Sequence, residues 1–253
     1  MKTSIIQLQH DDLLNKTQRI EKVCSIIDTL DTELIILPEL WNTGFFSFRD
    51  YYDNSEGENG ITISALSEKA KKKSCYICTG SIIEKDGEDY FNTSFLLDPD
   101  GKTIAKYRKI HLFGDEARFL KRGNKVTACE TDFGVVGLSI CYDLRFPELY
   151  RKLTKKGAQI LLNSSAWPAE RLEHWRMIIP VRALENQAVA VFCACAGENH
   201  GIRFTGHSMA INSDGTIIQE APANGEALTF DIDMEKNMLF RKIFPVLKDR
   251  VIF

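Results

Sequence analysis

The segment VVGLSICYDLRFPELYR, residues 135–151, joins an apolar strand pattern to a helix pattern through one cysteine. Residues 133–140 are mostly apolar, which is typical of a strand covered on both faces. Residues 145–157 then show helical spacing, and Gly157 marks the end of the predicted helix. Cys141 therefore lies just beyond a core strand, where a rigid scaffold commonly presents functional side chains to a crevice. This position distinguishes it from the other cysteines of the chain.

The rest of the chain alternates between strand and helix patterns. Strands are predicted at 3–8, 33–40, 75–85, 89–101, 158–165, 188–196, 204–212, 215–220 and 227–233. Helices are predicted at 13–30, 61–73, 145–157 and 169–187. The alternation favours an α/β fold, with one sheet covered on both faces or two sheets packed under outer helices. We expect a single domain over 1–253, in which the apolar and basic tail 240–253 packs at a subunit interface.

Composition and charge argue against several classes of protein. The chain has 253 residues and a formal net charge of −3, whereas nucleic-acid-binding proteins usually carry a basic face. Its apolar runs are shorter than the roughly 18 residues of a membrane span, and the first run is too short for a signal peptide. The seven cysteines lie mostly in apolar runs, which suits buried reduced thiols. We therefore expect a cytoplasmic protein with neither nucleic-acid nor membrane partners.

Three apolar segments lead to side chains with complementary chemistry. ELIILP leads to Glu39, AKYRKIHLF contains Lys109, and GLSI leads to Cys141. A thiolate is a nucleophile, a carboxylate can take and return its proton, and an ammonium can stabilise an oxyanion. Taken singly, each residue also has a plain structural interpretation. Glu39 could adjoin a helix start, Lys109 could be a surface charge, and Cys141 could be a small core residue.

Taken together, these segments resemble the nitrilase superfamily of carbon–nitrogen hydrolases. The resemblance runs through LPELWNTGF (37–45), KYRKIHLF (106–113), Asp115-Glu116, GLSICYDLRFPELYR (137–151), LLNSSAWP (161–168), HWRMIIPVRALENQ (174–187) and GHSMAINSDG (206–215). It spans nearly the whole chain in the family's order. It implies a four-layer αββα sandwich that forms a homodimer or a higher homo-oligomer through a helical layer.

The resemblance also implies a role for each matching residue. Glu39 would be the general base and acid, Lys109 the oxyanion stabiliser and Cys141 the nucleophile. Glu116 would be a second carboxylate that orients Lys109 or the attacking water, and the backbone N–H of Tyr142 would complete the oxyanion hole. No metal or organic cofactor is implied. A Cys–His hydrolase that uses His111 or His207 is an alternative from the residues alone.

The residues after the cysteine indicate which branch of the superfamily the chain resembles most. Tyr142-Asp143-Leu144 stands where true nitrilases usually carry Trp-Glu-Asn, and Leu144-Arg145 stands where D-carbamoylases carry two arginines. CYDLRFPE, LNSSAWP and the PVLKDR tail look most similar to the ω-amidase branch. Those enzymes hydrolyse the terminal amide of small α-keto acid amides such as α-ketoglutaramate. The alternatives are an amidase of deaminated glutathione, an N-carbamoyl amino acid hydrolase and a catalytically silent binding module.

Such a small-molecule amide substrate has a carboxylate at its other end. Four residues are candidates to contact the substrate. Arg145 could bind the carboxylate bidentately, or it could start the following helix and pair with Glu148 or Asp143. The other candidates are aromatic residues next to the catalytic segments, which could wall the pocket or be plain core: Trp41, Phe45 and Trp167.

Overall fold

The structure, a computed structural model, describes residues 1–251, which form two main β-sheets. The first sheet has the strand order β16-β1-β3-β4-β6-β5, with β7 also paired to β6. Its strands are β1 (Lys2–Ile6), β3 (Leu34–Ile36), β4 (Tyr76–Cys78), β5 (Ile82–Asp86), β6 (Asp89–Leu97), β7 (Thr103–Arg108) and β16 (Ala227–Asp231). The central strands β1, β3 and β4 run parallel.

The second sheet has the order β15-β14-β11-β10-β9-β8, and its central strands β9, β10 and β11 are parallel. Its strands are β8 (Ala128–Thr131), β9 (Gly134–Ile140), β10 (Ile160–Ser165), β11 (Val189–Ala194), β14 (Met209–Ile211) and β15 (Ile217–Glu220). A small third sheet joins β2 (Gln9–His10), β12 (Ala196–Asn199) and β13 (Ile202–Arg203). It links the two large sheets at the end where the site lies.

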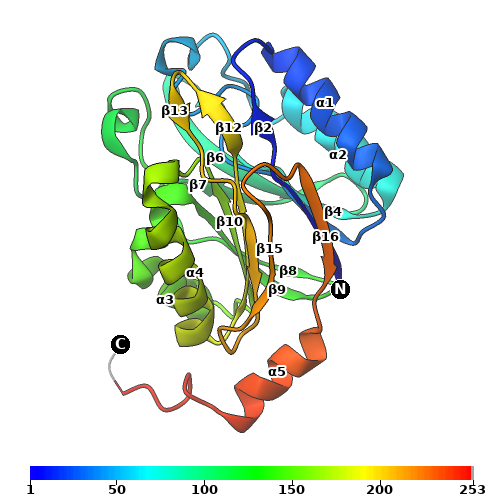
Figure 1. The fold of residues 1–253 in the computed structure, drawn as a ribbon, viewed down its shortest axis with the longest axis vertical. Helices are drawn as coiled ribbons and strands as arrows, with labels where there is room; N and C mark the ends of the chain where they lie inside the picture. Colours follow the sequence, from blue (N-terminus) through cyan, green and yellow to red (C-terminus); the bar gives the residue numbers. More distant parts are fainter. Residues whose placement is uncertain (252–253) are drawn as a thin grey trace.

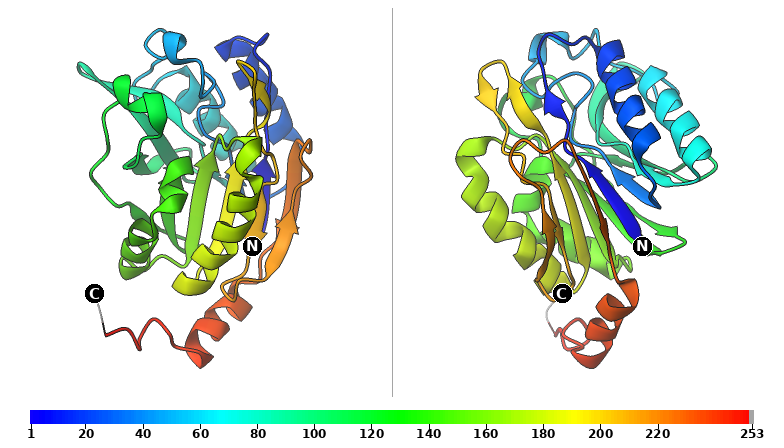
Figure 2. Two further views of the ribbon diagram at one scale, coloured as in Figure 1. Left: turned by 60° about the vertical axis from the view of Figure 1, so that its left-hand side comes forward. Right: turned by 45° about the vertical axis from the view of Figure 1, so that its right-hand side comes forward.

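Helices cover the outer face of each sheet, so the layers follow the order αββα (Figure 1). The helices α1 (Lys16–Thr29) and α2 (Ile61–Lys73) cover the first sheet, and α3 (Pro147–Lys155) and α4 (Leu172–Asn186) cover the second. Figure 2 shows the two pairs on opposite flanks of the molecule. In β3, Ile35 packs under α1 and α2, whereas its neighbours Leu34 and Ile36 pack between the sheets. The predicted α/β fold and the four-layer sandwich are confirmed.

Local sequence signals explain where several elements begin and end. Asn15 caps α1 and exchanges hydrogen bonds with Gln18, so the helix begins at Lys16 and not at residue 13 as expected. Pro147 occupies the first turn of α3, where its missing N–H costs nothing, and Gly157 follows the helix at φ +92°. No helix among residues 1–251 is long and apolar enough to cross a membrane.

The expected strand 75–85 is in fact two strands, β4 and β5. The break lies at Gly80, whose φ is +72° and whose added Cβ would stand 2.1 Å from the carbonyl oxygen of Pro38. Only a glycine permits this close approach to the chain that leads into Glu39. The strands β7 and β8 were not predicted from the sequence, and the expected strand 204–212 is reduced to β14.

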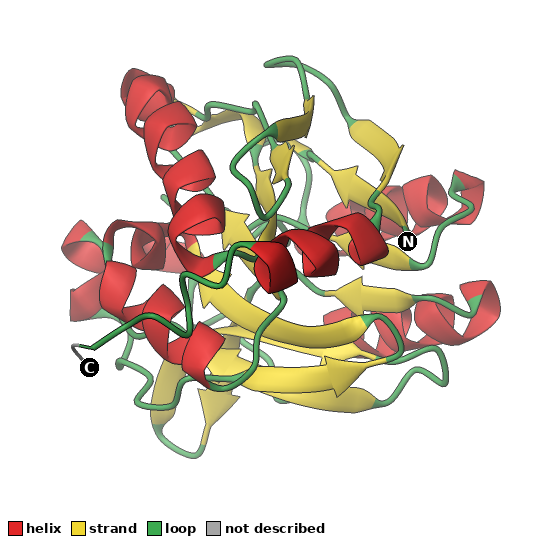
Figure 3. Ribbon diagram, turned by 90° about the horizontal axis from the view of Figure 1, so that it is seen from below, coloured by secondary structure: helices red, strands yellow, loops and turns green. Residues whose placement is uncertain are grey.

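A helix that the sequence did not predict, α5 (Met234–Ile243), follows the last strand of the first sheet. It lies across the ends of the sheets that point to the bottom of Figure 1. Figure 3 shows this helix from below, with the chain continuing from it towards the C-terminus. Arg241 donates to the Ala158 carbonyl at 2.9 Å, and Gln187 donates to the Phe244 carbonyl at 2.6 Å. These bonds fix the start of the 240–253 tail to the second sheet. Residues 252 and 253 lie outside the described residues, and the interface role of the tail stays a prediction.

Candidate active site

Four side chains that the sequence singled out meet between the ends of the two sheets. Glu39 follows β3, Lys109 follows β7, Cys141 follows β9, and Glu116 lies in the short helix η2 (Gly114–Arg118). The side chains of Glu39, Lys109 and Glu116 are fully buried, and Cys141 is 6% exposed. The ends of strands from both sheets therefore place one thiol, one ammonium and two carboxylates in a single enclosed cluster.

Lys109 bridges the two carboxylates of the cluster. Its Nζ donates to Oε1 of Glu39 at 2.7 Å and to Oε2 of Glu116 at 2.8 Å. Burial acts to lower the pKa of Lys109, but the carboxylates of Glu116 and Glu39 outweigh it and hold this pKa above its ordinary value. These contacts therefore favour the charged form of Lys109. Burial, followed by the nearby charge of Glu39, acts against the Lys109 attraction and raises the pKa of Glu116.

The sequence interpretation missed a fifth member of this cluster, Asn92 on β6. Its Nδ2 donates to Oε1 of Glu39 at 2.8 Å and to Oε1 of Glu116 at 2.7 Å. Its side chain is fully buried. In the sequence, Asn92 is only a polar residue within the predicted strand 89–101. A buried polar residue in a strand often has a structural role, so this position did not indicate a site.

Cys141 occupies a sharp turn between β9 and the single-turn helix η3 (Cys141–Arg145). Its φ is +43°, which is costly for a residue with a side chain and is commonly found at functional positions. The turn is held by the buried carboxylate of Asp143, which accepts from the backbone N–H of Ile140 at 3.0 Å, from Tyr107 at 2.6 Å and from the backbone N–H of His111 at 3.0 Å.

The surroundings of Cys141 favour the neutral form of its thiol. Burial raises its pKa well above the ordinary value, and the hydrogen bond and charge of Glu39 raise it further. The Lys109 ammonium acts in the opposite direction and is weaker. The second carboxylate oxygen of Glu39, Oε2, accepts from the Ala166 N–H at 2.9 Å. A neutral thiol next to an acceptor carboxylate can lose its proton at the moment of attack.

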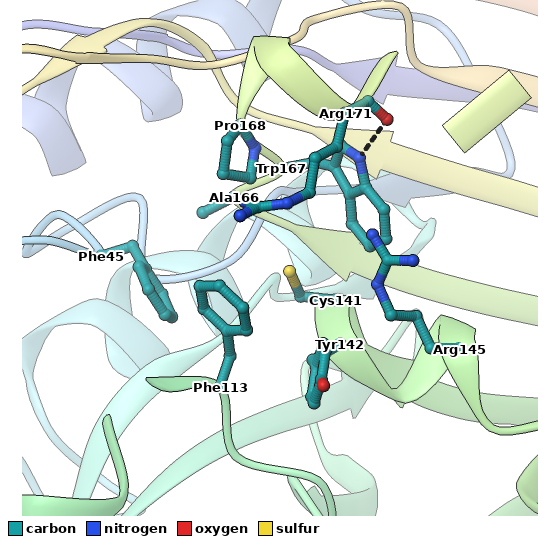
Figure 4. Close-up of a pocket in the computed structure, with 9 residues that line it drawn as sticks. All are labelled: Phe45, Phe113, Cys141, Tyr142, Arg145, Ala166, Trp167, Pro168 and Arg171. Atoms are coloured by element: carbon teal, nitrogen blue, oxygen red, sulfur yellow. Dashed lines mark hydrogen bonds between the residues drawn. The ribbon is translucent and has the colours of Figure 1, made fainter. Parts of the chain in front are cut away.

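A pocket with about 280 Å³ of empty space opens over the thiol (Figure 4). Apolar and aromatic side chains form much of its wall, and two arginines reach into it. The lining residues are Phe45, Phe113, Cys141, Tyr142, Arg145, Ala166, Trp167, Pro168 and Arg171. Of the expected substrate contacts, Arg145, Phe45 and Trp167 are in this wall.

Trp41 is not in the pocket wall, so the prediction that it contacts the substrate is wrong. Its side chain is fully buried among the residues beneath α1 and α2, and its indole N–H donates to the Thr79 carbonyl at 2.9 Å. The residue after Glu39, Leu40, has a φ of +43°, and this turn separates Trp41 from the site. Trp41 is a core residue whose hydrogen bond fixes the loop after β3.

The two arginines approach the pocket from different elements. Arg145 ends η3, and its guanidinium lies 4.7 Å from the centre of the Trp167 ring. Arg171 immediately precedes α4, and its guanidinium lies 5.5 Å from the centre of the Phe113 ring. Burial and the positive charge of Arg171 lower the pKa of Arg145. Arg171 was missed because it falls inside the predicted helix 169–187 and carries no distinguishing pattern.

Neither guanidinium forms an ion pair with a carboxylate anywhere in residues 1–251. The alternative pairing of Arg145 with Glu148 or Asp143 is therefore wrong. The Arg145 Nη2 instead lies 3.2 Å from Nδ1 of His174. Two partly buried cations without an anionic partner give the pocket a positive potential and favour a ligand that carries a carboxylate.

The two histidines of the Cys–His alternative are engaged elsewhere. Nδ1 of His111 lies 2.7 Å from the Asp143 carboxylate, and its ring stacks on Phe146 with centres 3.7 Å apart. His207 lies 2.8 Å from the Glu220 carboxylate. The carboxylate that the structure places at the thiol is Glu39. Among residues 1–251, no group of three or more His, Cys, Asp or Glu side chains could hold a metal ion.

Comparisons with known proteins show the family of the chain. The model of the carbon-nitrogen hydrolase family matches residues 2–242. A 2-oxoglutaramate amidase of Bacillus subtilis is 35% identical over 255 residues, which cover 98% of each chain. A deaminated glutathione amidase of Dictyostelium discoideum is 35% identical over 222 residues, with 81% of this chain and 76% of that protein covered.

Among solved structures, Saccharomyces cerevisiae Nit3, a member of branch 10 of the nitrilase superfamily, superposes with a TM-score of 0.90 at 31% sequence identity. The match covers 100% of this chain and 97% of that one. The fold, the family model and these relatives all converge on one assignment. The chain belongs to the carbon-nitrogen hydrolase family, the nitrilase superfamily, and is a hydrolase of carbon–nitrogen bonds other than peptide bonds.

Proposed function

We propose that this enzyme is an ω-amidase, which hydrolyses the terminal amide of a small α-keto acid amide such as α-ketoglutaramate. The observation that carries the proposal is the presence of Cys141 in one pocket with two arginines that lack a carboxylate partner. The substrate's carboxylate would bind between Arg145 and Arg171, which places its amide at the thiol. The similarity to a 2-oxoglutaramate amidase supports the same substrate.

The proposed reaction begins with proton transfer from Cys141 to Glu39. The sulfur electron pair forms a bond to the amide carbon, and the carbonyl π pair moves to oxygen. Lys109 and the backbone N–H of Tyr142 stabilise this oxyanion, a contribution that is typically worth about 100- to 1,000-fold in rate for one donor. Glu39 then returns the proton to the departing nitrogen, the C–N bond breaks, and ammonia leaves a thioester on Cys141.

The second half of the reaction reuses the same groups. Glu39 takes a proton from water, the resulting hydroxide oxygen bonds to the thioester carbon, and the C–S bond breaks to release the carboxylic acid. The thiolate regains its proton from Glu39. Glu116 holds Lys109 in place through the 2.8 Å bond to Nζ and so acts as a positioning residue. The proposed scheme uses only side chains and backbone of this chain.

A second amidase activity is suggested by the relatives of this chain. The amidase of deaminated glutathione is the second candidate, because a relative of that name matches most of the chain.

We also propose a homodimer that forms through α4 and the C-terminal tail. Met177, Val181 and Leu184 recur at helical spacing on one face of α4 and are 60%, 48% and 49% exposed. In the tail, Phe244 is 56% exposed and Val251 is 86% exposed. Exposed apolar residues that gather on one face of a helix are typical of protein–protein contacts. The free state of all seven cysteines supports a cytoplasmic location.

The proposed function is tested by ammonia release from a panel of substrates. The panel contains α-ketoglutaramate, α-ketosuccinamate, deaminated glutathione, an N-carbamoyl amino acid and a simple nitrile. The highest kcat/KM is expected for α-ketoglutaramate. A preference for the carbamoyl compound or the nitrile would overturn the ω-amidase proposal, and a preference for deaminated glutathione would replace it with the second candidate.

A further inference from the structure

We infer that Asn92 is a positioning residue that occupies Oε1 of Glu39 and leaves Oε2 as the atom that takes the proton from Cys141. The inference rests on the proposed roles of Glu39 and Cys141 and assigns the proton transfer to one oxygen. Asn92 does not touch the thiol. It acts through the carboxylate that does.

The orientation of the Asn92 amide is fixed by its neighbours. An amide nitrogen carries two N–H groups, and both are used here, one for Glu39 at 2.8 Å and one for Glu116 at 2.7 Å. The opposite orientation would place the amide oxygen against two carboxylates. The Oδ1 atom is left buried without a hydrogen-bond partner among the described residues. A buried acceptor without a partner is unfavourable, so the two donated bonds must offset it.

The two carboxylate oxygens of Glu39 differ in the number of lone pairs that are already used in hydrogen bonds. Oε1 accepts from Lys109 at 2.7 Å and from Asn92 at 2.8 Å, which uses both of its lone pairs. Oε2 accepts one backbone bond, from Ala166 at 2.9 Å. Only Oε2 therefore has a lone pair free to accept from the thiol. In the transfer, the S–H bond breaks, an O–H bond forms at Oε2, and the electron pair stays on sulfur.

Asn92 also supplies donors that the cluster would otherwise lack. The two buried carboxyl groups of Glu39 and Glu116 share the single ammonium of Lys109. The two N–H groups of Asn92 bridge the same two carboxyl groups from β6 and hold them in place.

The test is the rate of alkylation of Cys141 by iodoacetamide as a function of pH, followed by mass spectrometry of the peptide that contains Cys141. This reaction needs no amide substrate. In Asn92→Asp, the new group either adds a third carboxylate or, if protonated, donates only one bond. Either change disfavours a charged carboxylate in the cluster, so the acid limb of the pH–rate curve moves to higher pH. A shift of one pH unit corresponds to a rate about tenfold lower on that limb, and we expect at least this change.

A second variant and a matched control distinguish an effect on Cys141 from a general loss of folding. Asn92→Ser retains one donor, so its curve should shift in the same direction by less. Asn186→Asp places an acid at another fully buried asparagine, whose amide donates to the Arg182 carbonyl at the end of α4. Its curve should match that of the unmodified enzyme. Thermal unfolding of each variant identifies the ones that are folded.

A folded Asn92→Asp or Asn92→Ser protein whose curve coincides with that of the unmodified enzyme would overturn the inference. This outcome is separable from failure of the proposed function. If no compound in the panel releases ammonia but the alkylation curve still shifts, the substrate proposal fails and the role of Asn92 stands.

Discussion

The ammonium of Lys109 and the carboxylate of Glu39 lie 2.7 Å apart, and both side chains are fully buried. Both residues follow strands of the first sheet, and Glu39 also accepts from the Ala166 N–H just after β10 of the second sheet. Glu39 thus contributes to the site and to the packing of the two sheets. Loss of its ion pair with Lys109 should be measurable in stability as well as in activity.

Lys109→Met should lower the free energy of unfolding by about 3–5 kcal/mol, because it leaves Glu39 and Glu116 buried without a cation. Urea denaturation measures the change. Lys106→Met is the matched control. Lys106 is 35% exposed and pairs with Glu58 and Glu84, so we expect a loss below about 1 kcal/mol. Equal losses in the two variants would contradict the proposed burial effect.

Arg171→Met should lower kcat/KM for α-ketoglutaramate by about 10- to 100-fold, since a charge-assisted hydrogen bond is worth about 1.5–3 kcal/mol. The effect should lie mainly in KM, and hydrolysis of a small neutral amide should change little. Steady-state ammonia release with both substrates measures the split. Arg122→Met, at an exposed arginine that is not in the pocket wall, is the control. A parallel loss with both substrates would mean that Arg171 does not bind the carboxylate.

Val181→Asp should convert the proposed dimer to a monomer, because it introduces a charge into the exposed apolar face of α4. Light scattering coupled to size exclusion reports the molar mass directly. Leu13→Asp is a suitable comparison, since Leu13 is 90% exposed on a different part of the surface. The interface would be wrongly placed if both variants kept the mass of the unmodified enzyme.

His10 should make the stability of the fold depend on pH. Burial, followed by the charge of Arg19, lowers the pKa of His10 from 6.5 to about 4. Its folded pKa is depressed, so the neutral ring contributes stability above pH 6.5 that is lost as the pH falls towards 4. The full difference is about 3 kcal/mol.

His10→Asn removes this titration, so its free energy of unfolding should fall less than that of the unmodified enzyme between pH 6.5 and 4. Urea denaturation at several pH values gives both curves. Groups that do not contact His10 titrate equally in the two proteins and cancel in the difference. Parallel curves would show that His10 does not titrate in this range.

The sequence patterns predicted an α/β fold, and the family resemblance narrowed it to the four-layer sandwich. Buried strand patterns ended next to Glu39 and Cys141, and parallel strands present such ends at one edge of the sheets. The family resemblance added the order of the segments and brought in Glu116. The structure places all four residues together, and their catalytic roles stay predictions.

The remainder of the site depends on long-range packing that local patterns do not report. Asn92 lies in a strand, and its importance follows only from the carboxylates of two other segments that surround it. Arg171 precedes α4, and nothing in its neighbourhood in the sequence indicates that it faces Cys141. Trp41 is next to the catalytic segment but turns into the core, because the backbone reverses at Leu40. The helix α5 was not predicted because it is short and its composition is mixed.

The proposed nucleophile is tested most directly by ammonia release from α-ketoglutaramate by the unmodified enzyme and by Cys141→Ala, with both proteins shown to be folded. In the proposed mechanism the thiol forms the thioester, so the variant should lose at least about a thousandfold in kcat. A Cys141→Ala protein that releases ammonia at the rate of the unmodified enzyme would contradict the proposed mechanism.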